Sequence, residues 1–398
     1  MQRFRLLTRL SCILALIIVL SCTLILSGCT PSPALWRKFR GNVTNTGLAQ
    51  ADTATGVVRW SLGTFGPYPG CAIVWSGANY KTWTDSTVFF GNDAGRVFGV
   101  LPLQGNVVWV VDTGAAVMGC PAAPKDVIYV ANSLGQVYAF AAGFQPPKPI
   151  WVRDLGLGTS LSSPPTAYGG YIFIGANNSI YALRDTDGSI AWVKNLGAQV
   201  SLMSAPVITF EDVNGVLISN HNGRIFKFNV ENNGNEIWHH DIPNTTIAEA
   251  IAVGVDFTAY VVGNAGILYA LAPNDGHEKW RYDTGTGAYL TAPAIRYGAG
   301  KDWIYFADLK GTLYAVDQAG TLAWKQSLPD VPSSAPAVTQ SDIVYIAVGR
   351  PGTSKLVAVN KTQILWSVNT QEPLRAIAVA EDGSIYGNGL FKWFYAIK

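Results

Sequence analysis

One short phrase recurs along the whole chain and limits the fold more than any other feature. It opens with small residues and a proline, continues through an apolar run and a Gly-x-apolar-Tyr-Ala-apolar run, and ends after a turn at a tryptophan; residues 291–324 hold the clearest copy. Successive phrase tryptophans are 41 to 49 residues apart. They are Trp60, Trp109, Trp151, Trp192, Trp238, Trp280, Trp324 and Trp366. A period in the low forties, with about four strand-like runs per unit, is typical of β-propeller blades.

The Tyr-Ala run provides a second, independent count of the units. Its eight copies lie at 97–100, 137–140, 180–183, 225–228, 268–271, 313–316, 356–359 and 394–397. Alternating β-branched, aromatic and small residues suit strands that are buried between neighbouring blades. Both markers therefore predict an all-β fold, an eight-bladed β-propeller with four strands in each blade.

The order of the markers predicts how the ring closes. The first marker is the strand around Trp60, and the last is the Tyr-Ala run at the C-terminus, so the final unit lacks a tryptophan strand of its own. Pairing the Trp60 strand with the C-terminal strands at 376–380, 384–387 and 393–397 completes that blade. Closure also removes the exposed edge that a linear array would leave. The propeller is accordingly expected over 57–398, preceded by a segment at 36–56.

The phrase resembles the pyrroloquinoline-quinone-type, or quinoprotein-like, propeller repeat. The resemblance rests on the Tyr-Ala-Leu runs, which are followed by a glycine turn and a tryptophan, and on the Ser-Pro or Ala-Pro that opens the next unit. Residues 36–47 are similar to the segment that often precedes the first blade. The resemblance extends over about 36–398 and implies the fold. Its superfamily includes quinone-dependent dehydrogenases and non-enzymatic lipoproteins such as the outer-membrane barrel-assembly scaffold, so function stays open between these classes.

The first 28 residues have the composition of an export signal. Arg3, Arg5 and Arg9 precede an apolar run at 10–26, which is short for a membrane-spanning helix. The following Leu-Ser-Gly-Cys resembles the lipobox of bacterial lipoproteins. This resemblance implies a signal peptide at 1–28, diacylglyceryl attachment to Cys29 and a lipidated tether at 29–35. A plain signal peptide or a membrane anchor is the alternative.

A lipid anchor would hold a soluble domain at a membrane face outside the cytoplasm. If the host has two membranes, the absence of an aspartate after Cys29 favours the outer one, by analogy with the family. The formal net charge is +2, and loss of the three leader arginines brings it near −1. A net charge this close to zero gives no indication of the positively charged surface that binds nucleic acid. The expected partners are the membrane and an envelope protein, with the propeller itself monomeric.

A quinone cofactor would need residues that the sequence does not present. The dehydrogenases of the superfamily carry adjacent cysteines, an acidic base and a calcium or lanthanide cluster, whereas this chain has no Cys-Cys pair and no acidic group at metal-ligand spacing. No cofactor or metal is therefore expected, and pyrroloquinoline quinone with calcium is kept as the alternative. The segment 185–188, Asp-Thr-Asp-Gly, begins like a calcium loop but lacks its downstream glutamate, which favours a turn.

One residue opens the innermost strand of each unit, commonly just before a proline. The eight equivalent residues should surround one mouth of the central channel. In order they are Cys71, Cys120, Ser163, Ala205, Glu249, Ala292, Ala335 and Arg375. The two cysteines occupy consecutive blades in an oxidising compartment, so they are a candidate disulfide. It would close a loop of about 50 residues and add on the order of 4 kcal/mol in the loop-entropy model. The alternative is two buried thiols too far apart to bond.

Glu249 and Arg375 are the charged members of this ring. They could form a structural ion pair, be solvated, or contact a ligand at the channel mouth. Another irregularity is the first blade, whose loop at 76–86 is long and aromatic. Its candidate partner-binding or sugar-binding aromatics are Tyr68, Trp75, Tyr80 and Trp83, with a local hydrophobic plug as the alternative.

The sequence thus favours a membrane-anchored, non-enzymatic scaffold or protein-interaction module of the bacterial cell envelope. Two other classes remain open, a quinone-dependent dehydrogenase and a propeller that binds a carbohydrate or another small ligand. The repeated phrase does not separate them, because it specifies the construction of the ring. The discriminating residues are expected where the phrase is broken.

Overall fold

The computed structural model describes residues 40–398 with several short gaps. The gaps are Val43, Gln50, Asp52, Asp212, Ala248 and the segments 65–70, 77–85, 143–147, 157–162 and 198–203. The predicted signal peptide at 1–28, the lipidation site Cys29 and the tether at 29–35 lie outside the described residues. Within the described part, no helix is long and apolar enough to cross a membrane.

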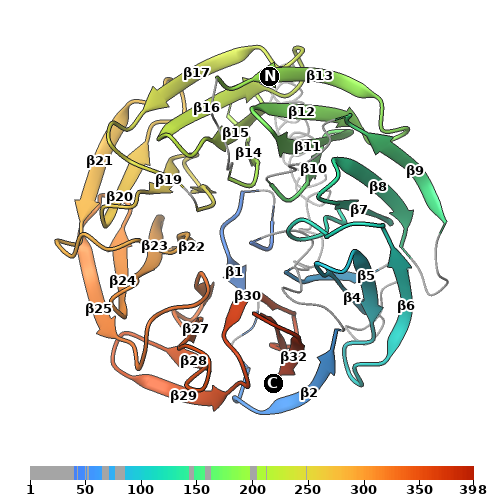
Figure 1. Cartoon of the computed structure of the whole chain (residues 1–398). Helices are drawn as coiled ribbons and strands as arrows, with labels where there is room; N and C mark the ends of the chain where they lie inside the picture. Colours follow the sequence, from blue (N-terminus) through green and yellow to red (C-terminus); the bar gives the residue numbers. More distant parts are fainter. Residues whose placement is uncertain are drawn as a thin grey trace, which may run out of the picture. The chain divides into compact units, whose positions relative to one another are not determined.

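The described strands form eight sheets arranged around a common centre (Figure 1). We number these blades from the first complete sheet in the chain. Blade 1 contains β3 (Ile73–Ser76), β4 (Ser86–Gly91), β5 (Arg96–Val100) and β6 (Val107–Asp112). Blade 2 contains β7 (Val127–Ala131), β8 (Gln136–Ala141) and β9 (Pro149–Asp154). Blade 3 contains β10 (Thr166–Tyr168), β11 (Tyr171–Ala176), β12 (Ser179–Arg184) and β13 (Ile190–Asn195).

The next three blades each have four strands. Blade 4 contains β14 (Val207–Thr209), β15 (Gly215–Ser219), β16 (Arg224–Asn229) and β17 (Glu236–Asp241). Blade 5 contains β18 (Ala252–Val253), β19 (Ala259–Val262), β20 (Ile267–Leu271) and β21 (Glu278–Asp283). Blade 6 contains β22 (Ala294–Gly298), β23 (Lys301–Asp308), β24 (Thr312–Asp317) and β25 (Leu322–Ser327).

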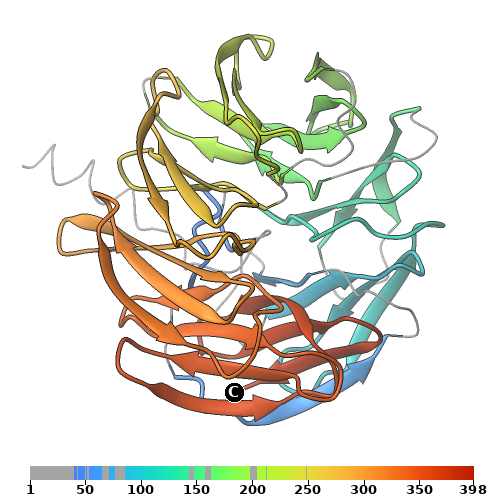
Figure 2. The ribbon, with the colours of Figure 1, turned by 60° about the vertical axis from the view of Figure 1, so that its left-hand side comes forward.

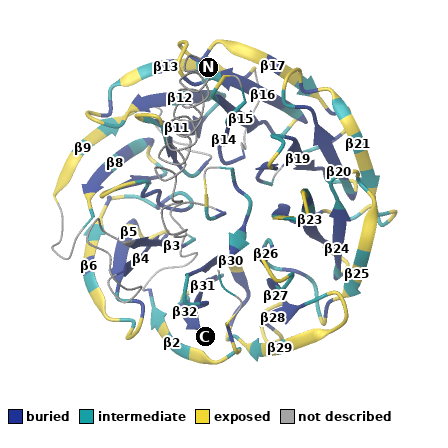
Figure 3. Ribbon diagram, turned by 180° about the vertical axis from the view of Figure 1, so that it is seen from behind, coloured by how far each residue is buried: buried dark blue, intermediate teal, exposed yellow. Residues whose placement is uncertain are grey.

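The last two blades both include a strand from the beginning of the described chain. Blade 7 contains β1 (Leu48–Ala49), β26 (Ala337–Thr339), β27 (Val344–Val348), β28 (Lys355–Val359) and β29 (Ile364–Asn369). Blade 8 contains β2 (Val58–Gly63), β30 (Leu374–Val379), β31 (Ile385–Gly389) and β32 (Trp393–Ile397). In every blade the strand nearest the rim is the most exposed and the strands behind it are largely buried (Figure 3).

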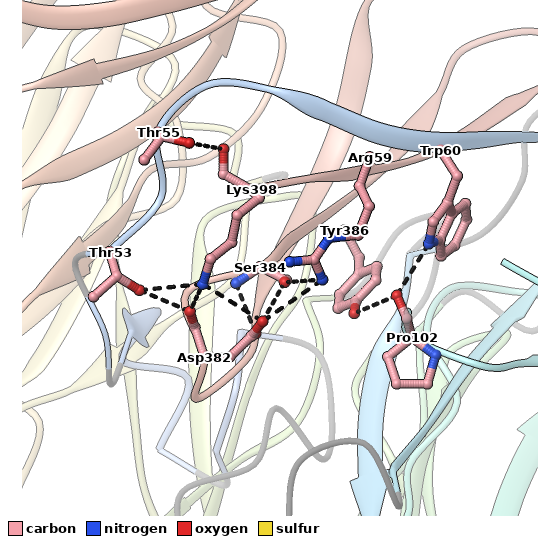
Figure 4. Close-up of polar contacts among 9 residues, drawn as sticks. All are labelled: Thr53, Thr55, Arg59, Trp60, Pro102, Asp382, Ser384, Tyr386 and Lys398. Carbon is pink, nitrogen blue, oxygen red and sulfur yellow. Dashed lines mark hydrogen bonds and ion pairs between the residues drawn. The ribbon is translucent and has the colours of Figure 1, made fainter. Parts of the chain in front are cut away.

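The predicted closure is confirmed. Strand β2 pairs antiparallel with β32, with Trp60 opposite Ala396, and the two lie side by side in both views of the ring (Figures 1 and 2). Val57 and Lys398 exchange two backbone hydrogen bonds of 2.8 Å. Side chains reinforce this seam, because Asp382 faces both Arg59 at 3.7 Å and Lys398 at 3.5 Å (Figure 4). The ends of the propeller are therefore joined within one sheet.

The eight-bladed propeller is confirmed, but not every blade has four strands. Blade 2 has three among the described residues, and its innermost segment pairs through isolated bridges, Val117 with Asn132 and Ala122 with Tyr129, without forming a strand. Pro121 and Pro124 flank the Ala122 bridge and have no N–H to donate, which explains why a ladder does not extend there. Blade 7 instead gains a fifth strand, since β1 pairs in parallel with β26.

The segment that carries β1 lies at the centre of the ring (Figure 1). Thr44 accepts a backbone hydrogen bond of 2.9 Å from Val253 of blade 5, and Thr46 accepts one of 2.7 Å from Ile295 of blade 6. Leu48 then lies opposite Val338 of blade 7. The sequence placed residues 36–56 ahead of the propeller. The structure shows in addition that residues 44–49 bind the innermost strands of three consecutive blades.

The phrase tryptophans form contacts between neighbouring blades. In blades 5 and 6 the tryptophan lies opposite the alanine of the Tyr-Ala run, Trp280 opposite Ala270 and Trp324 opposite Ala315, where a small side chain leaves room for the indole. A positive-φ glycine of the next blade often packs flat on the ring. At Gly276, a Cβ would lie 2.5 Å from the Trp238 indole. Trp238 also donates a hydrogen bond of 2.9 Å to the Pro273 carbonyl. We call this contact the tryptophan–glycine joint.

Candidate functional site

A cavity of about 230 Å³ lies where the innermost strands begin. Five residues of the predicted ring line it: Cys71, Cys120, Glu249, Ala335 and Arg375. The propeller therefore gathers at one place positions that are more than 300 residues apart in the chain. This cavity, which we call the channel-mouth cavity, is the candidate functional site. The predicted convergence arises because each blade repeats the same path from the rim back to the axis.

The structure joins the sulfur atoms of Cys71 and Cys120. Their Cα atoms are 4.7 Å apart, a separation that a disulfide spans readily. Cys120 is buried and packs in a hydrophobic cluster with Val117 and Ile128, while Cys71 is half-buried against the same cluster. The bond ties the segment before β3 to the irregular inner segment of blade 2. It thus lies at the blade where the inner ladder is shortest.

Arg40 is a cavity residue that the sequence did not single out. Its side chain is 6% exposed, and its two terminal nitrogens donate to the carbonyls of Pro293 at 2.5 Å and Pro336 at 2.8 Å. Nε has no hydrogen-bond partner among the described residues. Burial lowers the pKa of Arg40 to about 10, an effect that the charge of Glu249 opposes. Arg40 lies outside the repeated phrase, so no register argument could place it near the axis.

Glu249 and Arg375 have different surroundings. Burial raises the pKa of the Glu249 carboxyl, while Arg40 and a hydrogen bond from the Ala292 backbone act in the opposite direction. Arg375 is exposed at the cavity, and its charge acts on Asp93. The cation that influences Glu249 is thus Arg40. Arg375 is exposed, whereas Glu249 is only partly accessible.

Of the four predicted aromatics of the first blade, only Trp75 lies among the described residues. Tyr68, Tyr80 and Trp83 lie outside the described residues. Trp75 lies in β3 and is 6% exposed, with its indole N–H donating to the Lys125 carbonyl at 2.8 Å. The ring is therefore part of the packing between blades 1 and 2, and it does not present a surface to a partner. For Trp75, burial favours the plug alternative.

The segment 185–188 is a turn in blade 3 and takes part in a tryptophan–glycine joint. The Asp185 carbonyl accepts the Trp151 indole N–H at 3.0 Å, and a Cβ at Gly188 would lie 2.6 Å from the same ring. Two of the four histidines form exposed pairs, His239 with Glu236 and His277 with Asp275. The described residues contain no group of three or more His, Cys, Asp or Glu side chains that could hold a metal ion.

A second feature that the sequence analysis missed is a buried ion pair in blade 4. Lys227 occupies the alanine position opposite Trp238, and its Nζ lies 2.9 Å from a Glu211 oxygen. The same nitrogen donates to the Pro273 carbonyl at 2.8 Å, so it shares that acceptor with the tryptophan. The sequence did contain a sign of this feature, because the run 225–228 reads Ile-Phe-Lys-Phe and has lysine at the position where six of the other units have alanine.

Comparison with known proteins extends these observations. A family model described as outer membrane protein assembly factor BamB matches residues 104–265 and 264–391. The BamB of Yersinia pestis is 27% identical over 271 residues, which cover 62% of this chain and 65% of that protein. The aligned part is thus slightly less than two thirds of that relative.

Two solved structures share the fold. BamB from Moraxella catarrhalis superposes with a TM-score of 0.66 at 17% identity, covering 87% of this chain and 97% of that one. The quinohemoprotein alcohol dehydrogenase from Comamonas testosteroni superposes with a TM-score of 0.70 at 12% identity, covering 91% of this chain and 80% of that one. At these identities, the likeness to both structures concerns the fold alone.

Proposed function

Since the chain belongs to the family of the outer membrane protein assembly factor BamB, we propose that it is a lipid-anchored, non-enzymatic scaffold for the assembly of outer-membrane proteins. The observation that carries this proposal is the family match, which runs almost without interruption from residue 104 to residue 391. The relatives' name states a role in assembly. We transfer that role to this chain because most of its blades lie within the match.

The proposal includes the location and the anchor. Acylation of Cys29 and cleavage of 1–28 would place the propeller on the outer surface of the cytoplasmic membrane or at the outer membrane. A role in assembly favours the outer membrane. A single propeller held by its N-terminal lipid leaves the blade rims available to an envelope protein partner. The lipid itself provides membrane binding without a spanning helix.

The residues at the cavity do not fit a quinone held with calcium. Among the described lining residues, Glu249 is the carboxylate, and both Arg40 and the Ala292 N–H act on it. Calcium takes six to eight oxygen ligands, commonly from several carboxylates. Arg40 also places a cation where the calcium would need carboxylates. The scaffold proposal therefore contains no redox step.

Depletion of the protein in its source organism tests the assembly role. We expect a lower fraction of folded outer-membrane β-barrels, measured by their heat-modifiable migration in gels of isolated envelopes. Restoration by the natural chain, but not by Cys29→Ala, would support both the role and the anchor. The matched control is Cys22→Ala, which changes a cysteine inside the leader. An unchanged folded fraction after complete depletion would contradict the proposal.

A further inference from the structure

We propose that the propeller rests on a membrane surface containing anionic lipids, and that blades 6 to 8 make this contact at the channel mouth. The contact surface, which we call the mouth surface, consists of exposed loop residues. They are Tyr289, Leu309, Lys310, Arg350, Phe391 and Lys392. The inference deepens the proposed function, because it rests on the lipid anchor and adds the face that the anchored propeller turns to the membrane.

Strand pairing places these loops at the channel mouth. In each of the three blades, one residue pair joins the beginning of the inner segment to the end of the second strand. The pairs are Leu290 with Asp308, Pro332 with Val348, and Leu374 with Gly389. Residues 309–310, 350 and 391–392 come directly after these pairs in the chain. They therefore lie at the same end of three consecutive blades, beside the cavity that Tyr289 and Leu309 line.

The mouth surface combines large apolar side chains with cations. The apolar side chains are about half exposed, with values of 51% for Tyr289, 45% for Leu309 and 46% for Phe391. The Leu309 N–H donates to the Tyr289 carbonyl at 3.0 Å, so these two are neighbours. The exposed cations are Lys310, Arg350 and Lys392. Anionic membranes bind such surfaces, because apolar groups enter the headgroup region while cations meet the lipid phosphates.

Two of the three cations contact neutral groups. The Lys310 Nζ donates to the Thr286 carbonyl at 2.6 Å, and the Lys392 Nζ lies 5.0 Å from the centre of the Trp393 ring. Neither contact cancels the positive charge. Both lysines are exposed and can turn their ammonium groups towards an anionic surface.

The acidic groups in the same loops are largely occupied by the protein itself. Glu372 is buried, and its carboxylate accepts the backbone N–H groups of residues 391–393. Asp308 is buried and accepts the Lys310 N–H and the Tyr314 hydroxyl. Asp330 is partly exposed and is the acid on which the charge of Arg350 acts. The cations that remain therefore complement a negatively charged surface.

The corresponding loops of the other five blades have a different composition. They join the second and third strands at 92–95, 132–135, 177–178, 220–223 and 263–266, and they contain no lysine or arginine. In three of them an asparagine side chain closes the turn by accepting a backbone N–H, as Asn92, Asn132 and Asn220 do. Loop cations are thus confined to three consecutive blades, which gives the propeller one side suited to a membrane.

The anchored end of the chain lies near this face. Arg40 is the first described residue, and its side chain lines the channel-mouth cavity. Cys29 precedes it by eleven residues. A chain of that length spans at most about 40 Å when fully extended. A lipid on Cys29 therefore holds the channel mouth within that distance of the membrane, and contact through the mouth surface leaves the blade rims open to a protein partner.

Quenching of a fluorescent label by spin-labelled lipids tests the contact. The full acylated chain carrying Leu309→Cys is labelled with bimane at that thiol and placed in phosphatidylcholine vesicles with or without phosphatidylglycerol. The matched control is Leu322→Cys, which replaces an exposed leucine at the opposite end of blade 6. We expect most of the fluorescence at position 309 to be lost when phosphatidylglycerol is present, and little at 322. Equal quenching at both positions would overturn the proposal.

The contribution of charge is tested with Lys310→Gln and Lys392→Gln together. Loss of two cations near an anionic surface should weaken the docked orientation at least about tenfold. The phosphatidylglycerol fraction that gives half of the maximal quenching should therefore rise. The control is Lys361→Gln, an exposed lysine in the turn between the last two strands of blade 7. Equal quenching in pure phosphatidylcholine, or a double variant that behaves like this control, would contradict the assignment to anionic lipids.

The anchor and the contact can fail separately. Mass spectrometry of the chain from isolated envelopes shows whether Cys29 carries a lipid. If it does and the label at 309 is not quenched, the contact is wrong and the anchor stands. If it does not, the anchor is wrong, and flotation of the chain with the anionic vesicles at low salt decides the contact. Flotation that the lysine variants abolish would support the mouth surface, and no flotation would overturn it.

Discussion

The rim of this propeller repeats the same packing from blade to blade, whereas the axis does not. At the rim the blades solve the same packing problem in nearly the same way, with a tryptophan opposite a small residue and a glycine of the next blade packed on the indole. At the axis several blades differ from the others, with a disulfide, a buried arginine, a glutamate and an added strand. Repetition thus maintains the ring, and departures from repetition gather around the channel-mouth cavity.

The sharpest test of the rim compares two tryptophans. Trp238→Ala should lower the free energy of unfolding by about 4 kcal/mol, the usual cost of emptying a buried tryptophan site. Trp238 is 7% exposed, has a glycine packed on its ring and donates a hydrogen bond. Trp324 is half-buried, and none of the described glycines packs against its indole. Trp324→Ala should therefore cost less than half as much in urea unfolding. Equal costs would mean that the joint adds nothing.

At the axis, the largest single contribution is expected from the disulfide. Replacing Cys71 and Cys120 together by serine should lower the free energy of unfolding by about 3 kcal/mol, within the usual range for a native disulfide. Thiol titration of the natural chain, folded under oxidising conditions, should find neither cysteine free. Two free thiols, or a stability that does not respond to reductant, would contradict the bond. Alanine replacement of both cysteines controls for the new hydroxyl groups.

Asp302 of blade 6 accepts a hydrogen bond of 3.0 Å from the Val255 N–H of blade 5, and the contribution of Asp302 to stability should depend on pH. It is 0% exposed, and burial raises the pKa of its carboxyl to about 6 from an ordinary value of 3.8. The folded state then binds more protons than the unfolded state between these values. Stability from this group is present in acid and is lost as pH rises through about 6.

Because the pKa of Asp302 is raised by roughly two units, its contribution to the free energy of unfolding should increase by about 2 kcal/mol as the pH falls from 7 to 4. Asp302→Asn should remove that gain. The measurement is the difference between the two proteins in urea unfolding across this range, which cancels the other titrating groups. Parallel pH profiles for the two proteins would show that Asp302 ionises normally.

The smallest effect is expected at the seam of the ring. Arg59 and Asp382 are partly exposed, with their side chains 24% and 10% accessible. A double-mutant cycle with Arg59→Gln and Asp382→Asn should give a coupling of about 1 kcal/mol or less, as for other ion pairs near the surface. A much larger coupling would mean that the seam is held by charge more than by the β2–β32 ladder.

The sequence anticipated the repeated parts of the molecule and not the unrepeated ones. The blade number, the closing strand and the convergence of Glu249, Arg375 and the cysteines all follow from register, since each repeat returns the chain to the axis at the same point. The inward path of 44–49 and the position of Arg40 could not be inferred, because no second copy exists to set their register. Lys227 was visible as an exception, but its partner Glu211 lies outside the phrase.

The seam between the chain's first and last strands also determines when this protein can finish folding. Thr55 donates to the Lys398 carbonyl across 343 residues, and Thr44 and Thr46 bind blades made late in synthesis. Early blades can form as the chain emerges, but the ring stays open until its last residue arrives. Contacts this distant in sequence slow folding. The folding chain must therefore pass through an open form with unpaired strand edges, and that interval is when it is most exposed to aggregation and proteolysis.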